Sequence, residues 1–166
     1  GWKSTVLDSA SDGKSLASAT FNGQPAIAYT DTKSGDLKLA TFDGKKWNKV
    51  TVDGAGGSSG RTTNTISGSI SMCVNGSGLR QTLHIFYSDS TEKDLRYAVY
   101  NGKSFAVEIV DGNAPAVNEY TEIVRVRTAS DVSVANACVA TASSVQVFYR
   151  DETQGVLLGA VRTKTS

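Results

Sequence analysis

Three Tyr-x-Asp triplets recur along the chain and bring together side chains that could bind a ligand. They are Tyr29-Thr30-Asp31, Tyr87-Ser88-Asp89 and Tyr149-Arg150-Asp151. The carboxylates could bind sugar hydroxyls or a cation, and the tyrosines could line pockets between repeats. A structural role is the alternative, because aspartates at strand ends often accept backbone amides of the following turn, and repeated aromatics often pack between sheets. The candidate ligand-binding residues from this set are Tyr29, Tyr87, Tyr149, Asp31, Asp89 and Arg150.

A second recurring feature is an aromatic residue six positions before an aspartate. Trp47 precedes Asp53 in this way, Phe105 precedes Asp111, and Trp2 precedes Asp8. An indole or phenyl ring can stack on the apolar C–H face of a pyranose, or it can cover the edge of a sheet. Trp2, Trp47 and Phe105 are therefore candidate sugar contacts.

Residues that usually carry catalysis or metal binding are scarce. His84 is the only histidine and is a candidate ligand contact, although a single histidine on a strand is more often a hydrogen-bonded structural residue. The Walker and HExxH motifs do not occur, and we expect no cofactor, no metal and no catalytic residue set. Cys73 and Cys138 lack metal-site spacing and are expected to be buried free thiols; a bond between them would require Cα atoms within about 7 Å.

Length and charge exclude several partner classes. With 166 residues the chain can build one domain, residues 1–166, and its net charge of +1 does not favour nucleic acid as a partner. The sequence has no apolar run of the roughly 20 residues that cross a bilayer, so a membrane partner is not expected. Residues 1–8 lack the features of a secretory signal, which leaves a cytoplasmic protein or a trimmed secreted one as alternatives.

The spacing of the triplets defines a structural repeat. The three tyrosines are 58 and 62 residues apart, and the first two copies continue into the hairpin signals Asp43-Gly44 and Asn101-Gly102. The composition and the period favour an all-β β-propeller with three four-stranded blades per chain. The blade repeats are about 9–53, 54–111 and 112–166, with an outer strand at 2–8. The expected strands are 14–21, 25–30, 37–42 and 46–52 in the first blade, 67–74, 82–88, 95–100 and 104–110 in the second, and 132–140, 144–150 and 156–162 in the third.

The third repeat stops after three strands, whereas residues 2–8 have the spacing of a fourth strand. Propellers typically have four to eight blades, so three cannot close a ring. We therefore expect a homodimer that forms a six-bladed ring, in which each N-terminal strand completes the last blade of its partner. A nine-bladed trimer and a β-sandwich of duplicated hairpins are the alternatives.

The blade pattern resembles that of six-bladed propellers of the fungal fucose-specific lectin type and their bacterial relatives. It consists of an apolar strand ending in Tyr-x-Asp, a Leu-x-x-Ala strand, Asp-Gly or Asn-Gly, and then an aromatic. The resemblance implies a sugar site between blades, formed by an arginine on the second strand and a glutamate on the third. The residues at those positions here are Ala26, His84 and Gln146 for the arginine, and Leu39, Tyr97 and Gly159 for the glutamate. The fucose-binding signature is thus missing, which implies a different glycan or a non-sugar ligand.

Two function classes follow. The first is a non-enzymatic, lectin-like module that binds carbohydrate and becomes multivalent through the dimeric ring. The alternative is a small-molecule enzyme of the cyclase or isomerase type. It would use an axial or inter-blade pocket with His84 and the mixed-charge segment from Glu119 to Arg127. The longer connections, 54–65 and 112–131, are further candidate binding regions because insertions on a regular scaffold often carry function.

Overall fold

The computed structural model describes residues 1–113 and 129–163, and it folds into three antiparallel sheets with no helix among these residues. The first sheet contains β1 (Leu16–Phe21), β2 (Gln24–Asp31), β3 (Asp36–Phe42) and β4 (Trp47–Asp53), in this order. The second contains β5 (Ile66–Asn75), β6 (Thr82–Asp89), β7 (Asp94–Tyr100) and β8 (Phe105–Asp111). The third contains β9 (Asn136–Ala140), β10 (Ser144–Asp151) and β11 (Val156–Thr163).

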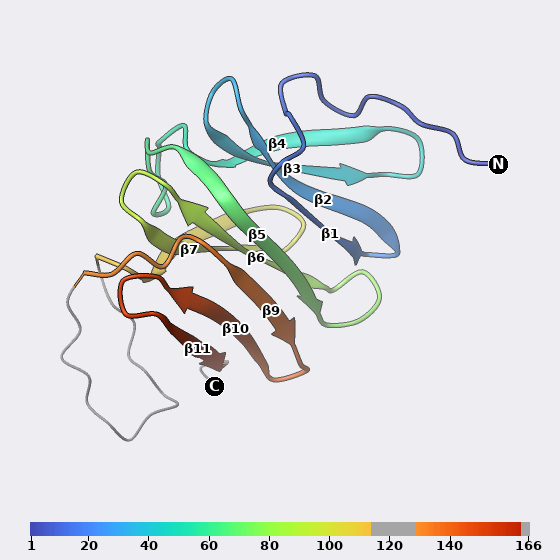
Figure 1. The fold of residues 1–166 in the computed structure, drawn as a ribbon. Helices are drawn as coiled ribbons and strands as arrows, with labels where there is room; N and C mark the ends of the chain where they lie inside the picture. Colours follow the sequence, from blue (N-terminus) through green and yellow to red (C-terminus); the bar gives the residue numbers. More distant parts are fainter. Residues whose placement is uncertain (114–128, 164–166) are drawn as a thin grey trace.

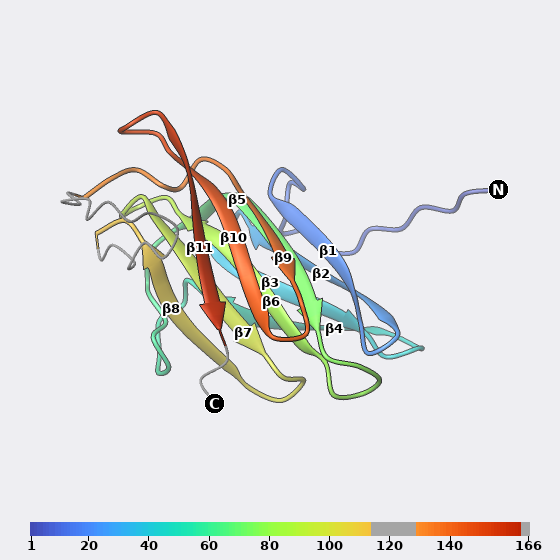
Figure 2. The same ribbon diagram turned by 90° about the horizontal axis from the view of Figure 1, so that it is seen from below.

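The sheets lie side by side like sectors of a fan, with the second in the middle (Figures 1 and 2). Each sheet is formed by strands that follow one another along the chain, which is the organisation of propeller blades. The expected strands are thus confirmed to within a few residues in the first two blades, and the β-sandwich alternative is wrong. Figure 1 also shows that the N-terminal segment lies beside the first sheet and that β11 lies at the opposite flank.

Two points bear on the expected fourth strand of the third blade. The third sheet has three strands among the described residues, and β11 is its outer strand. Residues 2–8 form no strand within the single chain. Residues 114–128, in the middle of the long connection 112–131, lie outside the described part of the chain. The expected mixed-charge cluster is among them: Glu119, Tyr120, Glu122, Arg125 and Arg127.

The strands form because their apolar side chains alternate between two cores. Along β6, Leu83, Ile85 and Tyr87 pack into the core between the first and second sheets, whereas Phe86 packs into the core between the second and third. Successive side chains of a β-strand point to opposite faces of the sheet. The middle sheet is therefore buried on both faces, and His84 lies on the face that meets the third sheet, the same face as Phe86.

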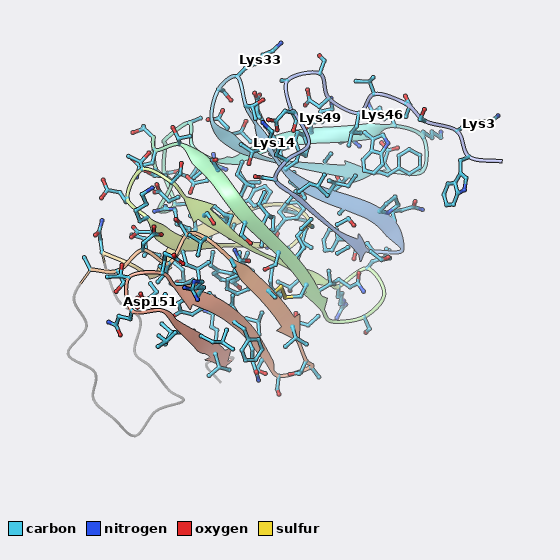
Figure 3. The ribbon with its side chains drawn as sticks, viewed as in Figure 1. Lys3, Lys14, Lys33, Lys46, Lys49 and Asp151 are labelled. Carbon is cyan, nitrogen blue, oxygen red and sulfur yellow. A yellow bond between two sulfur atoms is a disulfide. The ribbon has the colours of Figure 1, made fainter. Side chains whose placement is uncertain are left out.

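A disulfide joins Cys73 of β5 to Cys138 of β9, with their Cα atoms 6.0 Å apart (Figure 3). The expectation of free thiols is therefore wrong. The two cysteines occupy matching positions on the innermost strands of neighbouring blades, and these strands pack against each other closely enough for a bond to form. The disulfide fixes the second and third sheets to each other at their inner strands.

The described part of the chain includes no helix long and apolar enough to cross a membrane.

Candidate ligand-binding site

A polar cluster lies between the second and third sheets and begins at His84. The Nδ1 atom of His84 is 2.7 Å from the hydroxyl of Tyr97, and its Nε2 atom is 3.1 Å from Oδ1 of Asn75. Because the amide oxygen can only accept, Nε2 carries the proton and Nδ1 accepts from the phenol. Burial, with a contribution from the charge of Arg162, lowers the pKa of His84 to about 4. The imidazole is thus neutral near neutral pH and fixed in orientation.

Arg162 of β11 completes the cluster from the third sheet. Its guanidinium carbon lies 5.4 Å from the centre of the Tyr97 ring, which is cation–π geometry. Its Nε atom is 3.3 Å from Oε1 of Glu108 on β8, and both of these side chains are about half exposed. Glu108 is opposite Tyr97 in the β7–β8 register. Burial raises the pKa of Tyr97, so the phenol stays protonated.

This arrangement supplies the groups that a polyhydroxylated ligand needs. The cation of Arg162 and the carboxylate of Glu108 can donate to and accept from neighbouring hydroxyls, and both reach solvent. Tyr97 offers an aromatic ring beside them. His84, with its lowered pKa, is poorly suited to general acid–base catalysis near pH 7. The geometry therefore favours binding over proton transfer.

The matching positions between the first and second sheets have an apolar character. Ala26 and Leu39, which correspond to His84 and Tyr97, are both fully buried in the core. Phe21 packs over this region, with its ring centre 5.7 Å from that of Tyr100. Tyr100 is in turn the counterpart of Arg162. The polar cluster is therefore specific to one of the two interfaces within the described chain.

The three tyrosines of the Tyr-x-Asp triplets act between sheets. Each donates its hydroxyl to the aspartate that ends the fourth strand or segment preceding its own sheet: Tyr29 to Asp8 at 2.6 Å, Tyr87 to Asp53 at 2.7 Å and Tyr149 to Asp111 at 2.6 Å. All three tyrosines are buried. The contacts of Tyr87 and Tyr149 hold neighbouring blades together, whereas that of Tyr29 holds the N-terminal segment on the first sheet, with Asp8 in the place that Asp53 and Asp111 occupy in the other two cases.

The aspartates of the triplets organise the turns that follow them. Asp31 Oδ1 accepts from the amides of Lys33 and Ser34, and Asp89 Oδ1 accepts from those of Thr91 and Glu92. Asp151 lies at the β10–β11 turn (Figure 3), and its Oδ1 accepts from the amide of Gln154. The structure thus gives these carboxylates a turn-forming role.

The remaining candidate residues are spread over the molecule. Trp47 pairs across strands with Phe42, at 5.4 Å between ring centres, and Phe105 stacks on Tyr100 at 4.3 Å. Trp2 is fully exposed on the N-terminal segment. Arg150 forms an exposed ion pair with Glu152 through its Nε atom. Among the sequence candidates, only His84 belongs to the polar cluster in the single chain.

The first insertion packs against the middle sheet. Ser59 O accepts from the amide of Val107 on β8, and Gly60 O accepts from Nη2 of Arg96 at 2.6 Å. The Gly/Ser-rich loop 54–65 therefore covers the outer strand of the second sheet, which protects an edge that could otherwise pair with another chain.

The candidate residues predicted from the sequence did not include Asn75, Tyr97, Glu108 or Arg162. A signal for two of them was present in the repeat. Arg162 stands six residues after Val156, at the position of the aromatics Phe42 and Tyr100, and Glu108 stands at the position of Val50. Charged residues at positions that are apolar in other copies mark this interface as different.

No family model and no curated protein sequence matches the chain. Solved structures do. A fucose-specific lectin from Aleuria aurantia, described as a six-bladed β-propeller with a novel fucose recognition mode, matches with a TM-score of 0.57 and 16% identity. The match covers 95% of this chain and 46% of the lectin. A mercury derivative of a fucose-specific lectin from Aleuria aurantia matches with a TM-score of 0.54 and 15% identity, over 90% of this chain and 44% of its own.

A fucose lectin from Kordia zhangzhouensis, solved with methyl-fucoside, matches with a TM-score of 0.53 and 8% identity over 90% of this chain and 93% of its own. The present chain thus spans somewhat under half the length of the Aleuria lectin and nearly all of the Kordia lectin chain. Because 46% of a six-bladed chain corresponds to about three blades, the comparison agrees with the three sheets. The chain has the fold of the six-bladed β-propeller lectins, represented by three consecutive blades.

Proposed function

We propose that this protein is a lectin-like module that binds carbohydrate without converting it, with the cluster of His84, Tyr97, Arg162 and Glu108 as its binding site. The observation that carries the proposal is the half-exposed pair of Arg162 and Glu108 beside the Tyr97 ring, at an interface between blades. The fold is shared with lectins whose described ligand is fucose. The arginine and glutamate here lie on different strands from those of the family signature, so a glycan other than fucose is expected.

The aromatic residues at the start of the fourth strands would add stacking contacts. Trp47 and Phe105 lie in cross-strand aromatic pairs, and Trp2 is exposed. A pyranose C–H face on one of these rings would leave the hydroxyls free for the polar groups. The tyrosines and aspartates of the triplets support the site from inside the blades, because their polar atoms hold sheets and turns.

We further propose that two copies form a six-bladed ring in which N-terminal segments are exchanged. Three sheets per chain and the match to just under half of a six-bladed lectin support this stoichiometry. A ring of two chains would present at least two equivalent sites, so modest affinity at each site would be strengthened by avidity. The disulfide favours an oxidising compartment, such as the cell exterior.

The test is a glycan array on the intact protein, followed by titration calorimetry with the best glycan. Arg162→Ala and Glu108→Gln should each weaken binding at least 10-fold, because removing one partner of a charged hydrogen bond typically costs about 1.5–3 kcal/mol. Lys14→Ala, just before β1 and away from the cluster, is the control and should bind like the wild type (Figure 3). A blank array, or full affinity in both site variants, would refute the proposed site.

A further inference from the structure

The open face of the third sheet exposes apolar side chains at positions that are buried elsewhere. Leu157 is 77% exposed, whereas Leu95, at the same repeat position, is 0% exposed. Phe148 is 41% exposed, and its counterpart Phe86 only 4%. Leu95 and Phe86 are buried because the third sheet packs on them. By the same geometry, Leu157 and Phe148 face the position of a further sheet.

A matching groove lies on the open face of the first sheet. It has a volume of about 410 Å³, and its apolar lining includes Val6, Leu7, Leu16 and Ile27, with Tyr29 beside them. Ile27 stands two residues before its tyrosine, as Ile85 does before Tyr87, and Ile85 is fully buried where it receives the preceding sheet. The groove is thus the receiving face of the first sheet, and no preceding sheet covers it among the described residues.

The N-terminal segment already frames this groove as a fourth strand would. Asp8 accepts the hydroxyl of Tyr29 at 2.6 Å, in the manner of Asp53 with Tyr87, and Lys49 Nζ lies 3.4 Å from the same carboxylate. The Tyr29 hydroxyl and the amide of Ala10 are the largest causes that lower the pKa of Asp8, to about 2. Asp8 is therefore seated as the end of the outer strand of a blade that precedes the first.

A paired change in the repeat indicates which blade that is. In the first two blades, the glycine after the fourth strand packs on the first residue of the third strand. A Cβ atom built on Gly54 would lie 2.7 Å from Oδ1 of Asp36, and one on Gly112 would lie 2.0 Å from Oδ1 of Asp94. The third sheet has Val156 at the aspartate position, and the N-terminal segment has Ser9 at the glycine position.

Both members of this contact thus differ together, as expected if β11 and residues 2–8 belong to one blade. In the single chain, β11, which begins at Val156, and the N-terminal segment lie at opposite flanks (Figure 1), so this contact would form between copies.

We propose that Phe148 and Leu157 of one copy fill the groove beside Tyr29 of a second copy, while residues 2–8 of that second copy pair with β11. This inference rests on the proposed dimeric ring and specifies its contacts. In the register of β3 with β4 and of β7 with β8, Leu157 is then opposite Asp8 and Arg162 is opposite Trp2. The indole of the second copy thereby reaches the polar cluster, so each binding site is completed by both copies.

Sedimentation velocity on the intact chain tests the contact. The wild type should sediment at about 35 kDa, twice the 17.5 kDa of one chain. Leu157→Asp should sediment as a folded monomer, because a carboxylate cannot be buried in an apolar groove without a partner. Leu79→Asp is the matched control, since Leu79 is 84% exposed on the β5–β6 turn, away from both open faces, and it should remain dimeric.

A mixing experiment distinguishes loss of the contact between copies from misfolding of a single variant. Leu16→Asp alters the groove and Leu157→Lys alters the opposite face, so each variant alone should be monomeric. Mixed in equal amounts, the two variants should form a dimer with two contacts between the copies. One contact has the wild-type leucines on both sides, and in the other the introduced lysine faces the introduced aspartate. Failure to reassociate, while far-ultraviolet circular dichroism shows both variants folded, would overturn the proposed contact.

Glycan titration of the same samples separates the two proposals. If Leu157→Asp remains dimeric, the proposed contact between the copies is wrong, whether or not the protein binds glycan. If the wild type sediments at 17.5 kDa and an apolar dye occupies the groove, the groove is a small-ligand site and the dimeric ring is wrong as well. If Leu157→Asp dissociates as expected but the wild-type dimer binds no glycan, the proposed contact stands and the lectin function is refuted.

Discussion

Replacing Arg96 by methionine should destabilise the protein strongly, because it removes the cation from a buried ion pair between the first two blades. Arg96 Nε lies 2.9 Å from Oδ2 of Asp53, and both side chains are almost completely buried. The same carboxylate oxygen accepts the hydroxyl of Tyr87 at 2.7 Å, and Oδ1 accepts backbone amides. Methionine fills a similar volume, so the change tests charge rather than packing.

The expected loss is about 3 kcal/mol in the free energy of unfolding. Removing one partner of a buried pair typically costs about 3–5 kcal/mol, because the other charge stays buried. The lower end applies here since Asp53 keeps the Tyr87 hydroxyl and two backbone amides. At roughly 2–4 °C per kcal/mol for a chain of this size, the midpoint of thermal unfolding should fall by about 6–12 °C.

Urea unfolding at one fixed protein concentration measures this loss, because the stability of an assembling protein depends on concentration. Lys38→Met is the matched control: Lys38 has the same repeat position in the first blade, is partly exposed and lies 3.9 Å from its nearest carboxylate oxygen. That variant should lose less than about 1 kcal/mol. If Arg96→Met and Lys38→Met lose the same amount, the buried pair does not stabilise the interface and the reasoning is refuted.

Three further predictions follow from the structure. The pKa of His84 is lowered from its usual 6.5 to about 4, so as pH falls the unfolded chain binds this proton before the folded protein does. The free energy of unfolding should therefore fall as pH drops from about 6.5 to 4, and His84→Gln should flatten that part of a stability–pH curve. Replacing both Cys73 and Cys138 by serine should cost about 2–4 kcal/mol by urea unfolding, and a reductant should have no further effect on this variant. Gly112→Ala places a Cβ 2.0 Å from Oδ1 of Asp94, so its thermal midpoint should fall by several degrees. Gly13→Ala, which also has a positive φ but nothing within 4 Å of its Cβ, should lose much less.

Much of the fold could be predicted because the repeat is registered at several independent positions. The Tyr-x-Asp spacing, the two Gly-containing hairpins and the aromatic six residues before an aspartate together place every strand of the first two blades within a few residues. The disulfide could not be predicted with the same certainty. It depends on the 6.0 Å separation of two inner strands from different blades, and no local pattern encodes that distance.

The candidate site was predicted less well, for a physical reason. Pattern analysis finds residues that recur, and in this fold the recurring tyrosines and aspartates join blades and close turns. The polar cluster consists of residues that break the repeat, such as Arg162 at an aromatic position and Glu108 at a valine position. Comparing the copies for departures from the pattern is therefore the better search for function in a repetitive scaffold.

The two inter-blade interfaces differ in a way that bears on the proposed binding site. At the first interface Ala26 and Leu39 are buried beneath Phe21, and this packing stabilises the assembly of blades without leaving polar groups to bind a ligand. At the second, His84 and Tyr97 interrupt the apolar surface, and burial of such groups costs stability unless they are paired. The disulfide joins the same two blades at their inner strands, and Arg162 is half exposed at this interface. The disulfide thus joins the two blades whose shared interface holds the solvent-accessible cluster, whereas the polar groups of the first interface, Arg96 and Asp53, are buried.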